Sequence, residues 1–199
     1  MKGEGSLEKK KENEMGVAYC FLFFMTGCAE KPSFQAEYDW ELQDFNAVTQ
    51  DGKNVSSNDY KGEAWVANFI FTNCTTVCLP MTANMAKLQE MLAAEKVKAK
   101  MVSFSVDPER DIPEVLSEYA EKYEADLNTW NFLTGYSQED IQAIAKNFKT
   151  LAQKEEGTDQ VTHGTKIFLI NRDGVIVKGY NGLDVPYDKI IADLKLLND

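Results

Sequence analysis

The sequence predicts an α/β protein built around a largely parallel sheet. Two consecutive units, each a buried strand followed by an amphipathic helix, indicate parallel strands joined by crossover helices. The first unit is the apolar run 65–71 followed by a helix after Pro80, and the second is the run 101–106 followed by a helix to about Tyr123. A later hairpin and a closing helix complete the element order that is typical of a thioredoxin-like fold.

Turn signals and apolar spacing predict the other elements. Asp51-Gly52 lies between two short alternating runs and predicts a hairpin over 45–55, at the N-terminus of the domain. Asp173-Gly174 predicts a second hairpin by the same argument. Apolar spacing predicts a further strand and two further helices, at 130–133, 138–148 and 187–197. With 199 residues, the chain is long enough for one domain of ordinary size.

The N-terminal segment is typical of a secreted lipoprotein. Basic residues precede the apolar run 16–25, which is too short to span a bilayer as a helix but suits a secretory signal. Cys28 directly follows Thr26-Gly27, as in the lipobox of bacterial lipoproteins, although an incidental cysteine after an apolar segment is the alternative. We therefore expect a lipid-anchored protein outside the bacterial cytoplasm, with a signal peptide at 1–27, a tether at 28–41 and the thioredoxin-like domain at 42–199.

The charge of the chain argues against nucleic acids as partners. The formal net charge is −11, and such a surface repels phosphate backbones, so we expect no binding to nucleic acid. We expect the domain to act as a monomer.

A pair of cysteines lies in the connection between the predicted strand 65–71 and the helix that follows it. Cys74 and Cys78 are four residues apart, and in the first turn of a helix this spacing places two β-carbons on one face, about 5 to 6 Å apart. The two thiols could then share a metal ion or form a disulfide. A helix N-terminus lowers thiol pKa, which helps both reactions equally. The alternative is that both are small buried core residues.

The chain has a single histidine, His163, which distinguishes a metal site from a redox site. It lies in 151–165, a stretch without a clear pattern that we predict to be an inserted loop facing the cysteines. Thioredoxin-like reductases separate their cysteines by two residues and carry a cis-proline where Lys166 stands, so both hallmarks are missing. Two thiolates and one imidazole are a copper-friendly set, whereas zinc favours four ligands. A structural or exposed histidine is the alternative.

Three motifs in order resemble the Sco (SenC) family of copper proteins, over about residues 38–197. They are Phe71-Thr72-Asn73-Cys74-Thr75-Thr76-Val77-Cys78, Ser105-Val106-Asp107-Pro108-Glu109-Arg110-Asp111 and Val161-Thr162-His163. The resemblance implies a domain that binds one copper, Cu(I) or Cu(II), through Cys74, Cys78 and His163. It also implies a role in assembling the dinuclear copper (CuA) centre of cytochrome c oxidase subunit II, with copper taken from an unidentified donor.

The motifs also contain departures from the family and two further polar candidates. Leu79, Thr162 and Gly164 replace the commoner proline, acidic residue and polar residue at their positions. Asp107 ends the second strand at the same sheet edge as the cysteines, where it either supports the metal site, contacts a partner or shapes the turn. Asp111 is predicted to cap the following helix.

Three functions are therefore open. The first is a membrane-anchored copper chaperone for the oxidase, a binding protein and not an ordinary enzyme. The second is a thiol-disulfide reductase, with Cys74 and Cys78 as catalytic residues, which keeps the copper-ligand cysteines of the oxidase reduced. The third and weakest is a peroxidase, because Thr75 lies three residues before Cys78.

Overall fold

The computed structural model describes residues 33–198 except 75 and 156. The predicted signal peptide and the lipid-anchor residue Cys28 lie outside the described residues. Among the helices that are described, none combines the length and the apolar character needed to cross a bilayer.

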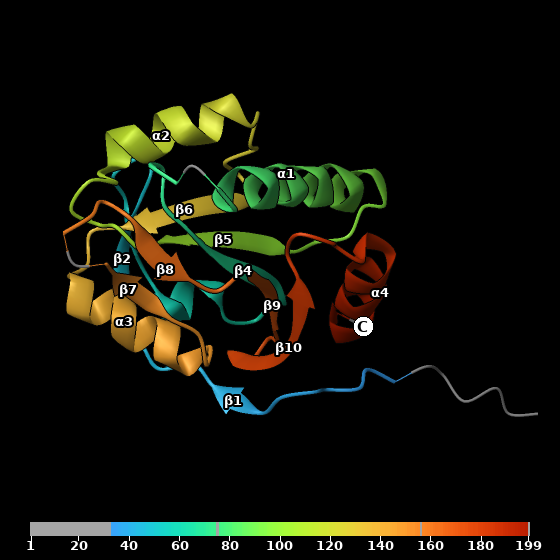
Figure 1. Ribbon diagram of the computed structural model, residues 1–199. Coiled ribbons are helices and arrows are strands. Elements are labelled where there is room, and N and C mark those ends of the chain that lie inside the picture. The colour runs from blue at the N-terminus through green and yellow to red at the C-terminus, as the bar shows by residue number, and fades with distance from the viewer. Residues whose placement is uncertain (1–32, 75, 156, 199) are drawn as a thin grey trace, which may run out of the picture. The chain divides into compact units, whose positions relative to one another are not determined.

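The centre of the domain is a mixed sheet of eight strands (Figure 1). Its order is β1-β10-β9-β4-β5-β6-β2-β3. The neighbours β4, β5 and β6 run parallel, whereas the remaining pairs are antiparallel. The strands are β1 (Trp40–Glu41), β2 (Asn46–Thr49), β3 (Asn54–Ser56), β4 (Trp65–Ile70), β5 (Lys100–Ser105), β6 (Trp130–Thr134), β9 (Lys166–Ile170) and β10 (Val175–Asn181).

Helices cover both faces of this sheet (Figure 1). They are η1 (Ser57–Tyr60), α1 (Cys78–Ala94), α2 (Pro113–Lys122), α3 (Gln138–Asn147) and α4 (Tyr187–Asn198). Apolar side chains of α1, α2 and α4 share one core with Val66 and Ile70 of β4. Those of α3 share the other core with Phe69 of β4. Alternate residues of this fully buried strand therefore serve both layers, as expected for a central strand with helices on each side.

The local sequence explains where the helices begin. Ser137 caps α3 by accepting a hydrogen bond from the Asp140 backbone, and the Asp140 side chain bonds back to Ser137, which completes a capping box. Pro113 opens α2, where its missing N–H and fixed φ are tolerated. Asp111 does not cap α2, because the capping position belongs to Ile112 and its backbone. The prediction for Asp111 was wrong.

Two segments are more ordered than the sequence predicts. The stretch predicted to be an inserted loop contains a second, two-stranded sheet of β7 (Ala152–Lys154) and β8 (Val161–His163). We call the segment from β7 to β8 the histidine hairpin. Within the range predicted as a tether, Trp40–Glu41 forms β1 on the edge of the main sheet. The backbone N–H groups of Glu37 and Tyr38 also bond to the Val177 carbonyl, so the ordered domain begins before residue 42.

Candidate metal centre

The cysteine turn lies at the carboxyl ends of β4 and β5, where open α/β sheets bind their ligands. Cys78 is the first residue of α1, whereas Cys74 precedes the helix instead of lying in its first turn. The backbone N–H of Cys78 points at the Cys74 sulfur, 3.4 Å away. Cys74 thus satisfies one of the free N–H groups at the helix start, although the spacing argument that placed both residues within one turn was wrong.

The two thiols are free and buried but differ in acidity. Cys78 is fully buried and Cys74 is 5% exposed. Burial alone would raise the pKa of Cys74, but hydrogen bonds from the Cys78 thiol and from Thr76 outweigh it and hold the pKa below its usual value. Burial raises the pKa of the Cys78 thiol well above its usual value, and the hydrogen bond to Cys74 raises it further. At neutral pH, Cys78 therefore carries its proton.

His163 is the last residue of β8, and its side chain contacts the Cys78 thiol. Its Nε2 lies 3.1 Å from the Cys78 sulfur, and its Nδ1 lies 2.9 Å from the Gly164 carbonyl oxygen. Because a carbonyl only accepts, Nδ1 donates the proton and Nε2 presents its lone pair to the thiol. Burial lowers the pKa of His163, against the opposing effect of the Gly164 carbonyl. The imidazole ring packs at nearly a right angle to the Phe71 ring, with the centroids 5.8 Å apart.

Gly164 lies directly against the Thr150 side chain. A β-carbon at this position would lie 2.0 Å from Thr150 Oγ1, a distance no side chain can occupy. The absence of a side chain lets the hairpin pass against Thr150 while His163 turns inward.

The three predicted donors come together. The sulfur atoms of Cys74 and Cys78 and a ring nitrogen of His163 all lie within 4.8 Å of one another. In the described part of the chain, no carboxylate or further histidine joins this group. Two sulfurs and one imidazole, partly shielded from water, could hold a soft metal ion with three protein ligands.

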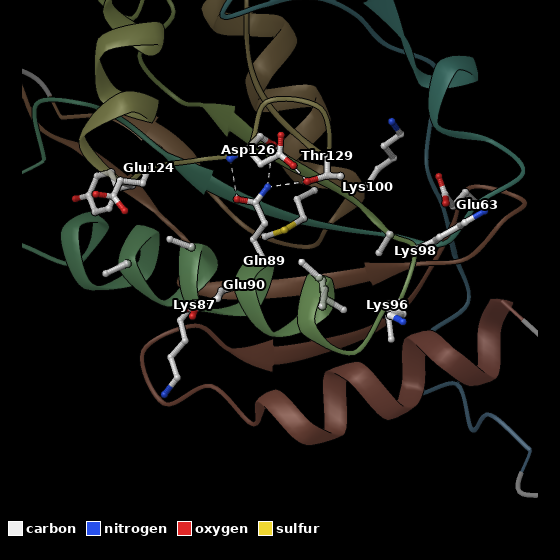
Figure 2. Close-up of a pocket in the computed structure, with 18 residues that line it drawn as sticks. Glu63, Lys87, Gln89, Glu90, Lys96, Lys98, Lys100, Glu124, Asp126 and Thr129 are labelled. Carbon is white, nitrogen blue, oxygen red and sulfur yellow. Dashed lines mark hydrogen bonds between the residues drawn. The ribbon is translucent and has the colours of Figure 1, made fainter.

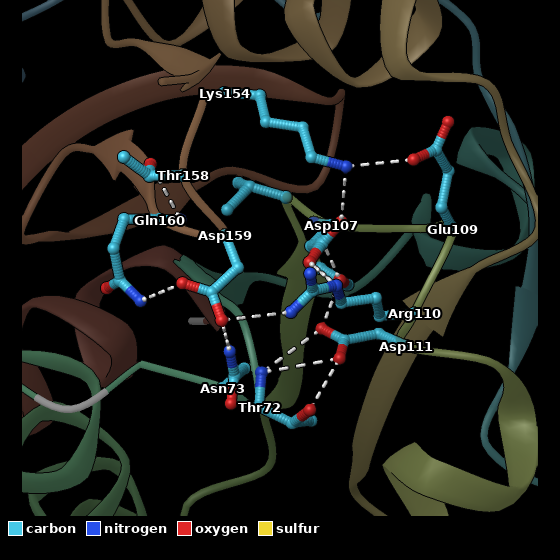
Figure 3. A network of polar contacts seen from close by, with 12 residues as sticks. Thr72, Asn73, Asp107, Glu109, Arg110, Asp111, Lys154, Thr158, Asp159 and Gln160 are labelled. Carbon is cyan, nitrogen blue, oxygen red and sulfur yellow. Dashed lines mark hydrogen bonds and ion pairs between the residues drawn. The ribbon is translucent and has the colours of Figure 1, made fainter. Parts of the chain in front are cut away.

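The two aspartates of the second motif make separate sets of polar contacts (Figure 3). Asp107 is fully buried and lies between Arg110 Nε at 3.6 Å and Lys154 Nζ at 3.5 Å. Asp111 accepts hydrogen bonds from the Thr72 backbone at 3.2 Å, from the Thr72 hydroxyl at 2.6 Å and from the Ser105 hydroxyl at 2.5 Å. Asp111 thereby ties the start of the cysteine turn to the end of β5.

A separate groove of about 920 Å³ lies along the C-terminal half of α1 (Figure 2). It is lined by both lysines and carboxylates. Gln89 Nε2 donates hydrogen bonds to the Asp126 backbone carbonyl and to the Thr129 hydroxyl. Neither cysteine and no part of the histidine hairpin lines it. The three candidate metal donors therefore lie outside this groove.

The sequence model of the SCO1/SenC family matches residues 35–198. The chain belongs to this family. Among solved structures, a SCO1/SenC family lipoprotein from Bacillus anthracis is 48% identical with a TM-score of 0.78, over 81% of this chain and 96% of that one. BsSco is a member of the Sco family of cytochrome c oxidase assembly proteins in which a disulfide switch has been identified. It is 46% identical to this chain with a TM-score of 0.78, over 84% of this chain and 98% of BsSco.

A more distant solved structure contains copper. Arabidopsis thaliana ScoI with copper bound is 25% identical to this chain, with a TM-score of 0.65 over 77% of this chain and 97% of the other. The agreement with the B. anthracis and BsSco structures confirms the predicted thioredoxin-like fold.

Sequence reasoning missed several residues that join the segments carrying the three candidate donors. Lys154 and Asp159 of the histidine hairpin lie in the stretch without a pattern, so no signal marked them. Asn73, next to Cys74, and Arg110 lie inside the quoted motifs, but only the structure shows that both contact Asp159. The role of Asp111 was missed because its position before a helix suggested a cap.

Proposed function

We propose that this SCO1/SenC protein binds one copper ion, Cu(I) or Cu(II), through Cys74, Cys78 and His163. We further propose that it delivers this ion to the CuA centre of cytochrome c oxidase subunit II. The observation that carries the proposal is the convergence of three soft donors within 4.8 Å at the end of the parallel strands. Copper is the cargo in this scheme, passed to thiolate and imidazole ligands of the same kind on the acceptor.

The environment of the donors suits copper better than zinc. Cu(I) accepts three ligands, and Cu(II) can add water or an oxygen donor, whereas a structural zinc ion requires a fourth ligand. The hydrogen bond from Nδ1 of His163 to the Gly164 carbonyl orients the ring with Nε2 toward the thiols. We assign Asp107 a supporting role, through the loop and hairpin that its charge holds together. The relatives with copper bound and with oxidase assembly in their names support both parts of the proposal.

The proposed location is the outer face of a bacterial cell membrane, with a lipid on Cys28 as the anchor. The B. anthracis relative, named as a lipoprotein, supports this. Replacing Cys28 with Ser should release the protein from the membrane fraction, and continued membrane association would contradict the anchor.

The second candidate function is thiol-disulfide reduction, favoured by the unequal acidity of the thiols. The Cys74 thiolate would attack a disulfide of the oxidase subunit to form a mixed disulfide and expel one target thiolate. Cys78 would then resolve it, leaving two target thiols and a Cys74–Cys78 disulfide. Each cycle transfers two electrons to the target, so a thiol reductant must regenerate the pair.

Titration with Cu(I) without oxygen tests the metal site directly. The protein should bind one Cu(I) tightly, and His163→Ala should bind much more weakly because one of three ligands is lost. Cys74→Ser should lose tight binding, whereas Asp39→Ala, at an exposed position without a side-chain partner among the described residues, should bind as the unmodified protein does. Equal binding by His163→Ala would contradict the ligand set.

Assembly of the oxidase in cells separates delivery from reduction. Cells with His163→Ala should lack active oxidase at low copper and recover when copper is added, if the protein delivers the metal. Full assembly at low copper in those cells, together with failure of the Cys74→Ser variant, would favour the reductase.

A further inference from the structure

The histidine hairpin depends on side-chain contacts for its position. β7 and β8 have three residues each and pair only with each other, forming a sheet separate from the main one. Two-stranded hairpins of this length are barely stable in water. Ala152 and Val161 pack into the same apolar core as the two cysteines. Lys154 and Asp159 make polar contacts with residues outside the hairpin. The position of His163 therefore rests on what the hairpin touches.

The turn of the hairpin is held to the cysteine turn (Figure 3). Asp159 Oδ2 accepts hydrogen bonds from Asn73 Nδ2 at 2.8 Å and from Arg110 Nη1 at 3.3 Å. Asn73 directly precedes Cys74, and Arg110 belongs to the loop after β5. One carboxylate thus joins the segments that carry the histidine and the cysteines.

A second contact holds the first strand of the hairpin. Lys154 Nζ lies 2.8 Å from Glu109 and 3.5 Å from Asp107, whose side chain is 1% exposed. A buried carboxylate is costly without a cation, so Asp107 draws Lys154 and Arg110 toward itself. Arg110 is shared by both contacts, since it reaches Asp107 and Asp159 at once.

We propose that the contacts of Asp159 with Asn73 and Arg110 are a latch that keeps the histidine hairpin closed over the thiols. Asp159 is then a positioning residue, and its release allows His163 to leave a bound metal ion and an acceptor ligand to take its place. In this exchange the bond from His163 to the metal ion breaks and a bond from the acceptor ligand forms, with no change of oxidation state. The freed Asp159, Asn73 and Arg110 groups are hydrated as the hairpin opens. This inference rests on the proposed copper function for its effect on metal transfer, but not for its effect on the hairpin.

Asp159→Ala removes the latch without touching a metal donor. Asp159 and Arg110 are about half exposed, so the variant should fold, and contacts of this kind change a local equilibrium by about threefold to tenfold. In the copper-free protein, backbone hydrogen exchange in β7 and β8 should become faster by that factor, while exchange in β4 stays unchanged. In the Cu(I) protein, transfer to a chelating acceptor should accelerate similarly.

Two further variants sharpen the test. Asp39→Ala removes an equivalent exposed charge and should change neither rate. Arg110→Gln should act in the same direction as Asp159→Ala, and the double variant should show less than the product of the two single effects, because they break a shared contact.

The outcomes separate the latch from the copper function. Unchanged hydrogen exchange in the hairpin of Asp159→Ala would overturn the latch, whatever the protein binds. Faster exchange in the hairpin with unchanged copper transfer would overturn its role in metal release. Failure of the unmodified protein to bind Cu(I) would overturn the proposed function, and hydrogen exchange would still decide whether the latch exists.

Discussion

The sulfur of Cys78 lies 3.1 Å from Nε2 of His163, although 85 positions separate the two residues in the chain. The Gly164 carbonyl holds the proton on Nδ1, so the lone pair of the imidazole faces a thiol that burial keeps protonated. A metal ion that binds between these atoms must displace the thiol proton. The imidazole needs no such change, because burial favours its neutral form.

The apparent affinity for Cu(I) should therefore rise with pH. Only the thiolate binds the metal, and the raised pKa of Cys78 means that its proton is released on binding throughout the neutral range. Each released proton makes the affinity increase by about tenfold per pH unit. Competition titrations with a chelator of known pH dependence, between about pH 6 and 8, measure this slope. An affinity that does not change with pH would contradict a protonated Cys78.

Much of this arrangement is readable from the sequence, because it depends on strong local signals. The apolar run that forms β4, the helix that follows it and the turn at Asp173-Gly174 are all predicted within a few residues of their observed bounds. The carboxyl end of β4 then places Cys74 and Cys78 at the usual ligand edge of such a sheet. The predicted loop 151–165, which faces the cysteine turn in such a fold, brings His163 to the same place.

What the sequence does not predict depends on contacts between distant segments. Strands β7 and β8 have three residues each, too few for an alternating pattern to be visible. β1 has two residues and is defined by its partner β10. Asp111 lies where a helix cap is expected, but its carboxylate turns to Thr72, 39 positions away. Such long-range hydrogen bonds leave no periodic trace along the chain.

The contact between Gly164 and Thr150 predicts a loss of metal affinity on adding one methyl group. Gly164→Ala should push the hairpin away from Thr150, displace His163 and weaken Cu(I) binding, and overpacking of this kind costs about 1–3 kcal/mol of stability. Calorimetry of the copper-free protein and the Cu(I) titration measure the two effects.

Removing the Thr150 atoms that oppose a β-carbon at position 164 should reverse this loss of stability and metal affinity. Thr150→Ala deletes the hydroxyl that a β-carbon at Gly164 would meet, so adding Thr150→Ala to Gly164→Ala should recover part of both stability and affinity. Equal binding by Gly164→Ala and the unmodified protein would show that the hairpin shifts without consequence for His163.

Asp111→Ala should destabilise the fold by about 2 kcal/mol, because it leaves the donors of buried Ser105 and half-buried Thr72 without their acceptor. Burial raises the pKa of Asp111, against its hydrogen bonds. A raised folded pKa gives a stability contribution that is complete below the unfolded pKa and is lost as the pH rises through the folded pKa. The difference between the two proteins should thus narrow from about pH 4 toward neutrality.

Chemical denaturation at several pH values tests this, with Asp39→Ala as the control for the lost charge. A stability difference that widens toward neutral pH would contradict a raised pKa for Asp111.

The opposite pH dependence is expected for Asp193 of α4, which bonds the Tyr180 hydroxyl at 2.7 Å and the Lys178 ammonium at 3.0 Å. Burial alone would raise the pKa of Asp193, but these two partners outweigh it and lower the pKa. A lowered folded pKa gives stability that is complete above the unfolded pKa and is lost as the pH falls through the folded pKa. The contacts of Asp193 with Tyr180 and Lys178 therefore stabilise the fold at neutral pH, and this stabilisation is lost in acid.

Asp193→Asn should lose about 3 kcal/mol at neutral pH, because the Lys178 ammonium, 5% exposed, is left without its main counter-charge. In acid, where Asp193 is protonated in both states, the difference between the proteins should shrink. Adding Lys178→Met should restore part of the lost stability, since an apolar chain of similar length replaces the stranded charge. Denaturation of the single and double variants at neutral and acid pH measures this, and a loss that is the same at both would show that the ion pair contributes nothing.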